Sequence, residues 1–355
     1  MPHTYRILSL GASYGSLLAI KFVAAGHDVM LACLPAEAEA FNRDGARVRM
    51  PAKGREGLVE IDSRRLPGKL AAEAPDRIDA AGYDLVVLAM PEPQYRAAGV
   101  RELLAAVARG GMPCMSIMNM PPLPYLARIP GIALDPLRPC FTDATVWDGC
   151  DPALMTLCSP DPQALRPPDQ PVNVLQVRLP TNFKAARFAG DAPTRILRDL
   201  AAGIEAARFD VDGAKIELPV KLKVHDSVFV PLAKWSMLLA GNYRCVGKDG
   251  MRSIRDAVHG DLAVSRTVYE WVMRLCESLG AARSDLVPFD KYANAALSLE
   301  SPSSAARALA NGARDIERVD RLVQALAVQK GMRSAEVDAI VIAVDGWLAK
   351  NRARA

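Results

Sequence analysis

The chain opens with YRILSLGASYGSLLAIKFVAAGHDVMLAC at residues 5–33. The apolar run 5–10 predicts a strand, the turn 11–16 leads into a predicted helix over 17–25, and residues 29–33 predict a second strand. This order is typical of the start of a dinucleotide-binding domain. In such a domain, glycines let the backbone approach a pyrophosphate, and the helix N-terminus supplies unpaired N–H groups.

The turn departs from the usual G-x-G-x-x-G spacing, because Ser13 stands where a middle glycine is expected. A second interpretation is that Gly11 ends a buried strand and Gly15 permits close helix–strand packing, with no nucleotide involved. The position of the turn, after an N-terminal strand and before a helix, favours the dinucleotide. The residues expected to contact it here are Gly11, Ala12, Ser13, Tyr14, Gly15 and Ser16.

The composition is that of an ordinary globular protein of 355 residues, half of them hydrophobic, with a net charge of +4. No block of like charge indicates nucleic-acid binding, no apolar run approaches the ~20 residues of a membrane span, and we see no signal peptide. The seven cysteines are scattered and never form C-x-x-C, which favours reduced thiols in a cytoplasm. His225 and His259 have no further ligands at metal-site spacing. We therefore expect a cytoplasmic protein without a metal site.

Strand-like and helix-like segments alternate in the first half, which predicts parallel strands joined by right-handed crossovers. The apolar run 85–90 is typical of a strand buried on both faces, and 113–118 is a further predicted strand. Ligands of such sheets bind at the carboxyl ends of the strands, so we expect Met90 and Asn119 to face the same crevice as the glycine turn. The other elements expected in this half are a helix over 95–107 and strands over 153–157 and 172–179.

The pattern becomes helical in the second half. We expect a Rossmann-like α/β domain with a parallel sheet over residues 1–188 and an all-helical domain for substrate binding or dimerisation over 189–355. The cleft between two such domains is a common place for a substrate. The long predicted helices could form a homodimer face or belong to the intramolecular core. The helices expected here are 194–208, 226–239, 253–280, 303–330 and 334–350.

Lys234 is the residue of the second half that is best suited to a catalytic role. It lies in VFVPLAKWSMLLAGN, residues 228–242, where nearly all of its neighbours are apolar. Burial would favour the neutral amine and let the side chain give and take a proton near neutral pH. Asn242 follows eight residues later, toward the same side of a helix. The alternative is that the stem of Lys234 lies along the helix while its ammonium reaches water.

These motifs resemble those of the ketopantoate reductases (2-dehydropantoate 2-reductases). The matching positions are few, but they are spread over most of the chain. The segment GHDV at 26–29 is similar to a family Gly-His-(Asp/Glu)-Val, and Lys234 stands where the family has the lysine of W-x-K-x-x-x-N-x-x-x-N. The other positions that match family motifs are Gln94, Asn119, Asn242, Ser303 or Ser304, and Glu317.

The resemblance implies a Rossmann-like first domain and a helical second domain similar to that of 6-phosphogluconate dehydrogenase. It implies reduction of a small 2-oxo acid or related carbonyl with NADP as the cofactor and NAD as the alternative. Lys234 would be the general acid, with Asn242 and Glu317 beside it in the catalytic set. The cofactor contacts implied beyond the glycine turn are Met90, Gln94 and Asn119.

Several positions depart from the family pattern. Leu34 stands near the position of the arginine that recognises the 2′-phosphate of NADPH, and Cys33 offers no carboxylate for a ribose hydroxyl. Two other functions therefore stay open. One is an opine-type dehydrogenase, which joins an amino acid to a 2-oxo acid. The other is a Rossmann-like protein that binds a nucleotide or metabolite without turnover. The remaining departures are Pro91, Met120, Leu232 and Leu238.

Overall fold

The structure is a computed structural model that describes residues 3–354, and it divides into two compact units. The first unit contains the chain up to Met90, then Gln94–Arg128 and Thr145–Asp226; the second contains Pro91–Pro93, Ile129–Ala144 and the chain from Ser227. The domain boundary expected after residue 188 falls inside the first unit. The reason is that β14 (Leu222–His225) pairs with β11 (Phe183–Ala186), so the chain returns to the sheet after residue 188.

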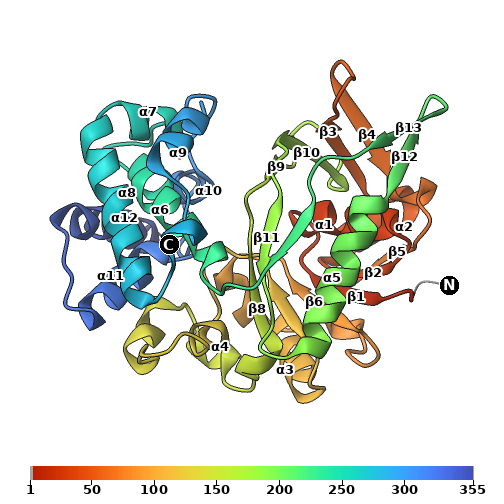
Figure 1. The fold of residues 1–355 in the computed structure, drawn as a ribbon, viewed down its shortest axis with the longest axis horizontal. Coiled ribbons are helices and arrows are strands. Elements are labelled where there is room, and N and C mark those ends of the chain that lie inside the picture. The colour runs from red at the N-terminus through yellow and green to blue at the C-terminus, as the bar shows by residue number, and fades with distance from the viewer. Residues whose placement is uncertain (1–2, 355) are drawn as a thin grey trace. The chain divides into compact units, whose positions relative to one another are not determined.

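An eight-stranded sheet forms the centre of the first unit, with the strand order β14-β11-β8-β7-β6-β1-β2-β5 (Figure 1). The strands from β8 to β5 all pair in parallel, and β11 joins β8 in the antiparallel direction. The predicted parallel sheet is confirmed. The bounds of its other strands are β1 (Arg6–Leu10), β2 (Asp28–Ala32), β5 (Leu70–Glu73), β6 (Leu85–Leu88), β7 (Cys114–Ser116) and β8 (Met155–Ser159).

Helices connect these strands. The α1 helix (Gly15–Ala24) joins β1 to β2 and is buried along its whole length, because its sequence is apolar on nearly every face. The α5 helix (Asp191–Ala206) packs against α1 and β14. The helix expected over 95–107 begins as a 3₁₀ turn and becomes regular only in α3 (Val100–Arg109). The remaining helices of this unit are α2 (Pro35–Asp44) and α4 (Leu123–Leu126).

A second, four-stranded sheet in the first unit has the order β4-β3-β10-β9. The strand expected over 172–179 is present as β10 (Val174–Leu179), but it belongs to this smaller sheet, where it pairs with β3 and β9. The sequence pattern did not predict the partners of β10 or the hairpin β12–β13. Their bounds are β3 (Arg47–Pro51), β4 (Leu58–Asp62), β9 (Gln163–Leu165), β12 (Arg208–Val211) and β13 (Ala214–Glu217).

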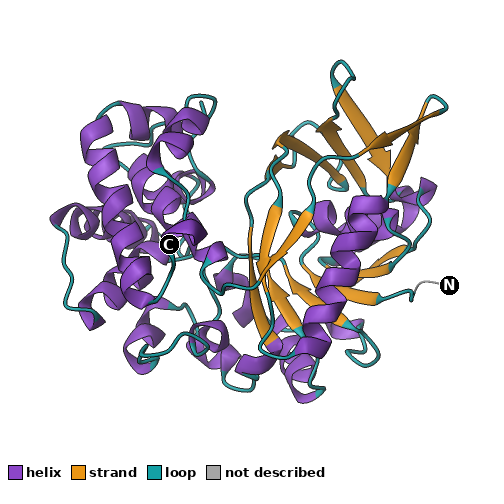
Figure 2. Cartoon of the chain, viewed as in Figure 1, coloured by secondary structure: helices purple, strands orange, loops and turns teal. Residues whose placement is uncertain are grey.

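The second unit is helical throughout its regular elements, as Figure 2 shows by colour. Two long helices expected here are each broken in two. The first break falls at Gly260-Asp261, where Asp261 accepts a hydrogen bond from Val264 N–H and caps the next helix. Ser334 caps the last helix as predicted. The helices are α6 (Lys234–Met237), α7 (Ile254–His259), α8 (Leu262–Leu279), α9 (Phe289–Ala296), α10 (Ser304–Ala310), α11 (Val319–Gln329) and α12 (Ala335–Ala353).

Candidate functional site

The glycine turn follows β1 at the carboxyl edge of the main sheet. Because β2, β1, β6 and β7 run in parallel, the turn, Met90 and Asn119 all follow strand ends at this one edge. The Gly11 N–H donates a hydrogen bond of 2.9 Å to the carbonyl oxygen of Ala32, which ties the turn to the end of β2. The first unit thus places the glycine turn, Met90 and Asn119 along one edge of the main sheet.

Both glycines of the turn are required by contacts inside the protein. Gly11 has a φ of +109°, and a Cβ there would lie 2.6 Å from Met90 Cγ and 2.9 Å from the carbonyl oxygen of Ala89. A Cβ on Gly15 would lie 2.7 Å from the Ser9 hydroxyl. The turn therefore meets the demands of close strand–helix packing, which the second interpretation of the sequence proposed.

The same turn fits a pyrophosphate. The first N–H groups of an α-helix have no partner within the helix, and Tyr14 at the N-cap of α1 provides no capping side chain. These N–H groups and the positive end of the helix dipole suit an anion. Ser13 is the exposed side chain of the turn, while Ala12 and Ser16 are buried. The Ser16 hydroxyl donates to the Ser13 carbonyl oxygen at 2.8 Å.

Tyr14 turns its side chain into the protein. Its hydroxyl donates to the carbonyl oxygen of Pro162 at 2.7 Å, and its ring meets that of Phe183 edge-on. Burial raises the pKa of the Tyr14 hydroxyl well above its ordinary value, and the charge of Asp161 raises it further. Tyr14 can therefore contribute its backbone to a ligand at this turn, while its hydroxyl is already engaged.

The other three residues expected to contact the cofactor differ from one another in burial. Met90 is half-buried against Gly11, and its N–H donates to the Tyr95 hydroxyl at 3.2 Å. Asn119 is half-buried beyond the end of β7. Gln94 is exposed in the 3₁₀ turn Glu92–Arg96.

Lys234 is the first residue of α6 in the second unit. The residues on both sides of it, Ala233 and Trp235, are buried, as the apolar sequence predicts. Lys234 itself is half-buried. Its position combines an apolar surround with partial access to solvent.

The helix that begins with Lys234 widens into a π-helix over Leu238–Asn242. In a regular α-helix, Asn242 would lie about 80° around the axis from Lys234. A π turn takes up one additional residue, which rotates Asn242 back toward the side that carries Lys234. Such turns are frequent at functional sites. The π turn therefore supports the expected pairing of these two side chains on one side of the helix.

Two hydrogen bonds bring the later candidate residues to this π turn. The Ser303 hydroxyl donates to the backbone oxygen of Asn242 at 2.7 Å. The Tyr243 hydroxyl donates to the backbone oxygen of Glu317 at 2.5 Å and accepts from the Val319 N–H at 3.1 Å. Segments more than sixty residues apart in sequence thus meet at Asn242 and Tyr243. Sequence reasoning missed Tyr243, for which the only signal was its position beside Asn242.

Of the two candidate serines, Ser303 makes this contact. It is 2 % exposed, and its hydroxyl also accepts from the Ala306 N–H at 3.2 Å, which caps α10. Glu317 is half-buried and lies in the connection between α10 and α11. The hydrogen bond from the Tyr243 hydroxyl fixes the backbone of Glu317 and so positions the Cα atom that carries its side chain.

A buried ion-pair network follows Glu317 directly. The Arg318 guanidinium donates two hydrogen bonds, of 3.0 and 2.9 Å, to Asp320, whose side chain is fully buried. It also donates to Asp345 of α12 at 2.7 Å. Burial raises the pKa of the Asp320 carboxyl, and the Arg318 charge opposes that rise. The network anchors the segment that carries Glu317 to α11 and α12.

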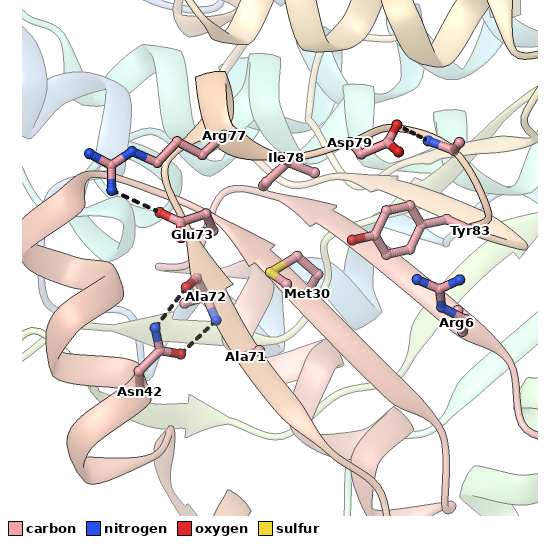
Figure 3. A pocket seen from close by; sticks show the side chains of 11 residues that line it. Arg6, Met30, Asn42, Ala71, Ala72, Glu73, Arg77, Ile78, Asp79 and Tyr83 are labelled. Atoms are coloured by element: carbon pink, nitrogen blue, oxygen red, sulfur yellow. Dashed lines mark hydrogen bonds and ion pairs between the residues drawn. The ribbon is translucent and has the colours of Figure 1, made fainter.

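A cavity of about 470 Å³ lies elsewhere in the first unit, over β1, β2 and β5 (Figure 3). Arg6 and Tyr83 stand at one end of it, Glu73 and Arg77 at the other, with Met30 between them. None of the expected cofactor or catalytic residues is among those that line this cavity.

Two features are absent from the described residues. No helix among them combines the length and the apolar character needed to cross a bilayer. Residues 3–354 also contain no group of three or more His, Cys, Asp or Glu side chains that could hold a metal ion.

Comparison with known proteins gives matches in structure alone. No protein-family model matches the sequence, and no curated protein matches it. Solved structures match over nearly the whole chain. One, a protein described as a ketopantoate reductase from Ralstonia solanacearum MolK2, has a TM-score of 0.67 at 14 % identity, covering 99 % of both chains.

Two other structures show the same likeness. The 2-dehydropantoate 2-reductase of Methylococcus capsulatus has a TM-score of 0.64 at 13 % identity, covering 98 % of this chain and 97 % of its own. A D-mandelate dehydrogenase, solved with NADH and anilino(oxo)acetate, has a TM-score of 0.63 at 12 % identity, covering 98 % and 99 %. The predicted fold class is confirmed, and the resemblance to ketopantoate reductases holds at the level of the fold.

Proposed function

We propose that the chain is an NAD(P)-dependent oxidoreductase that reduces a small 2-oxo acid or a related carbonyl, with Lys234 as the general acid. The observation that carries this proposal is the meeting of three candidate segments at one π turn: Asn242 within it, Ser303 bonded to it, and Glu317 bonded to the next residue. This turn begins four residues after Lys234 in a chain with the ketopantoate reductase fold.

The first unit would hold the nucleotide. The N–H groups at the start of α1 would bind the pyrophosphate, with Gly11 to Ser16 forming the turn around it. Met90, Gln94 and Asn119 would contact the rest of the cofactor. The nicotinamide, when bound, supplies the hydride.

The second unit would supply the polar groups for the carbonyl. Lys234, as an ammonium, would protonate the alkoxide that develops after hydride transfer and stabilise its charge beforehand. The Asn242 amide would orient the carbonyl by donating a hydrogen bond. The Glu317 carboxylate would accept one from a hydroxyl or amine of the substrate.

Two structural neighbours support parts of this proposal. The D-mandelate dehydrogenase was solved with NADH and an oxo acid, which favours that substrate class for the shared fold. A ketopantoate reductase of Staphylococcus aureus with this fold is dimeric. We extend both properties to this chain as proposals: a 2-oxo acid substrate and a homodimer.

The test follows oxidation of NADH and of NADPH by the purified protein with a panel of 2-oxo acids. Lys234→Ala should lower kcat about a hundred- to ten-thousandfold while leaving the Kd for the nucleotide unchanged. Lys248→Ala is the control, because Lys248 is an exposed lysine of the same unit. Turnover that survives in Lys234→Ala would contradict the proposed role.

A parallel series adds amino acids to each 2-oxo acid. An opine-type dehydrogenase would oxidise the nucleotide only when both substrates are present, and its product would be a secondary amine. Oxidation with the 2-oxo acid alone, giving a 2-hydroxy acid, is the result we expect.

A further inference from the structure

The end of β2 is where a Rossmann-like domain distinguishes NADH from NADPH, because the adenosine ribose lies there. In this chain β2 ends at Ala32, and the side chains of the next two residues are poorly suited to binding either a ribose hydroxyl or a 2′-phosphate. The Cys33 thiol is buried, and a thiol is only a weak hydrogen-bonding group. Leu34 has an apolar side chain that is 69 % exposed. The usual positions therefore offer neither a carboxylate nor a cation.

A carboxylate reaches the end of β2 from the first turn of α2. Glu37 is the third residue of that helix, and its carboxylate accepts a hydrogen bond of 3.4 Å from the Leu34 N–H. The same strand end is bonded to the phosphate turn through Gly11 N–H and the Ala32 carbonyl oxygen. Glu37 thus lies at the strand end beside the glycine turn, although it comes four residues after the usual position.

Arg166 holds this carboxylate in place. It follows β9 in the smaller sheet, and its guanidinium forms an ion pair with Glu37. The two side chains are only 23 % and 18 % exposed. Arg166 Nη1 makes this contact, while Nη2 is buried with no hydrogen-bond partner. A carboxylate fixed in this way can accept a hydrogen bond without first being ordered.

The charged groups near this point are two carboxylates and two guanidinium groups, of which only one guanidinium is largely buried. Burial raises the pKa of the Cys33 thiol to about 12; the charge of Glu37 adds to the rise, Arg166 opposes it and Glu73 adds again. Two carboxylates therefore surround the strand end beside one buried guanidinium. A second cation, Arg77, has its Nη1 4.0 Å from Glu73 Oε1, but its side chain is 74 % exposed to solvent. A 2′-phosphate would bring close to two further negative charges to this place.

A ribose 2′-hydroxyl suits the same surroundings, because it donates a hydrogen bond and a carboxylate accepts one. We infer that Glu37, positioned by Arg166, is the residue that binds the adenosine ribose, and that the chain prefers NADH to NADPH. This inference rests on the proposed function. It departs from the NADP that the family resemblance implies.

Equilibrium titrations of the purified protein with NADH and with NADPH, followed by nucleotide fluorescence, test the inference without any turnover. We expect the wild type to bind NADH at least about tenfold more tightly. Glu37→Gln should weaken the binding of NADH about ten- to a hundredfold, the usual cost of losing a charged hydrogen bond. It should also reduce the ratio between the affinities for NADH and NADPH. Glu39→Gln removes the same charge from an exposed position of α2 and should leave both affinities unchanged.

Arg166→Met tests the positioning role, because it frees the carboxylate without removing it. We expect a smaller loss of NADH affinity and a retained preference for NADH. A wild type that prefers NADPH and loses that preference in Arg166→Met would overturn the inference in favour of a phosphate site on Arg166. An unchanged ratio of affinities in Glu37→Gln would also overturn it, with the proposed function still standing. If neither nucleotide binds, the proposed function fails and this inference fails with it.

Discussion

In the first unit the candidate functional groups follow the ends of strands, whereas in the second unit they follow breaks in helices. Gly11 and Met90 come directly after or shortly after β1 and β6. Asn242 lies in a π turn and Ser303 caps α10. A parallel sheet presents its strand ends along one edge, while a broken helix leaves backbone groups that need polar partners. Polar side chains therefore gather at the breaks.

The two units also differ in what fixes these positions. Close approach of backbone to backbone holds the turn at Gly11, where no side chain fits. Buried side-chain hydrogen bonds hold the second unit, from Tyr243 to the Arg318–Asp320 pair. The comparison predicts that loss of a buried polar side chain most strongly destabilises the second unit, and that a change in backbone at the glycine turn destabilises the first.

The largest effect is expected from Arg318→Met. It leaves Asp320 fully buried without its cation, which costs about 3–5 kcal/mol of the free energy of unfolding. The control is Arg266→Met, because Arg266 pairs with Asp290 at the surface and such pairs contribute about 0–1 kcal/mol. Denaturant unfolding measures both variants. Equal losses in the two would contradict the claim that buried polar contacts hold the second unit.

Lys21 provides the matching experiment on buried charge in the first unit. It is 2 % exposed in α1, and its ammonium donates to the carbonyl oxygens of Leu218 and Pro219 at 3.3 and 2.8 Å. Burial lowers the pKa of Lys21 to about 7, and the nearby charge of Lys221 lowers it too. Lys21 in the unfolded chain keeps its proton up to about pH 10.5, its ordinary value. The unfolded state therefore binds more protons between these two values.

It follows that Lys21 makes the wild type more stable as pH rises through this window. The gain should be on the order of 3 kcal/mol between pH 7 and 9.5. Lys21→Met removes this dependence, so its stability relative to the wild type should fall with rising pH. Thermal unfolding across this range measures the difference, with the exposed Lys53→Met as the control. Parallel curves for wild type and Lys21→Met would show that Lys21 is not desolvated.

Gly11→Ala tests the backbone contact at the phosphate turn. The added Cβ meets Met90 and the Ala89 carbonyl oxygen at a positive φ, which should cost about 2–3 kcal/mol. Gly54→Ala is matched to it, because Gly54 has a φ of +76° and a Cβ there would meet nothing within 4 Å. That control should lose about 1 kcal/mol. Equal losses would mean that backbone conformation, without the close contact, explains the glycine.

The smallest effect is expected at Ser303. Ser303→Ala removes a helix cap and the bond to Asn242, which should cost about 1–2 kcal/mol. Ser334→Ala removes a cap of the same kind, at α12, together with an exposed hydrogen bond to Glu336, and should cost about 1 kcal/mol. The difference in unfolding free energy isolates the bond to the π turn. A Ser303→Ala loss no larger than that of Ser334→Ala would remove this link between the segments.

The sequence predicted five strands of the main sheet, β1, β2, β6, β7 and β8, because central strands buried on both faces read as apolar runs, as at 85–90. It missed β5, β11 and β14, which lie toward the two edges of that sheet. It missed β3 and β4, where charged and apolar residues alternate over short stretches. It also joined helices across Gly260-Asp261 and Asn311-Gly312. There the apolar spacing continues, although both pairs are signals that can end a helix.

The sequence singled out Lys234 because it is a lone charged residue in an apolar segment, and its role stays a prediction. The π turn was not predictable, because nearly every face of residues 228–242 is apolar and periodicity cannot reveal its pitch. The contact between Tyr243 and Glu317 spans 74 residues and depends on tertiary packing. The position of Glu37 is not evident from the sequence, because the usual place of the ribose carboxylate is occupied by Cys33 and the start of α2 brings Glu37 near it from four residues away.

The central claim is that this chain transfers a hydride from a reduced nicotinamide to a carbonyl. Its most direct test uses NADH that carries deuterium at both C4 positions, together with a 2-oxo acid, and mass spectrometry of the product. The account predicts a 2-hydroxy acid with one deuterium at its C2 carbon. Binding of the nucleotide without deuterium transfer to any 2-oxo acid of the panel would contradict it.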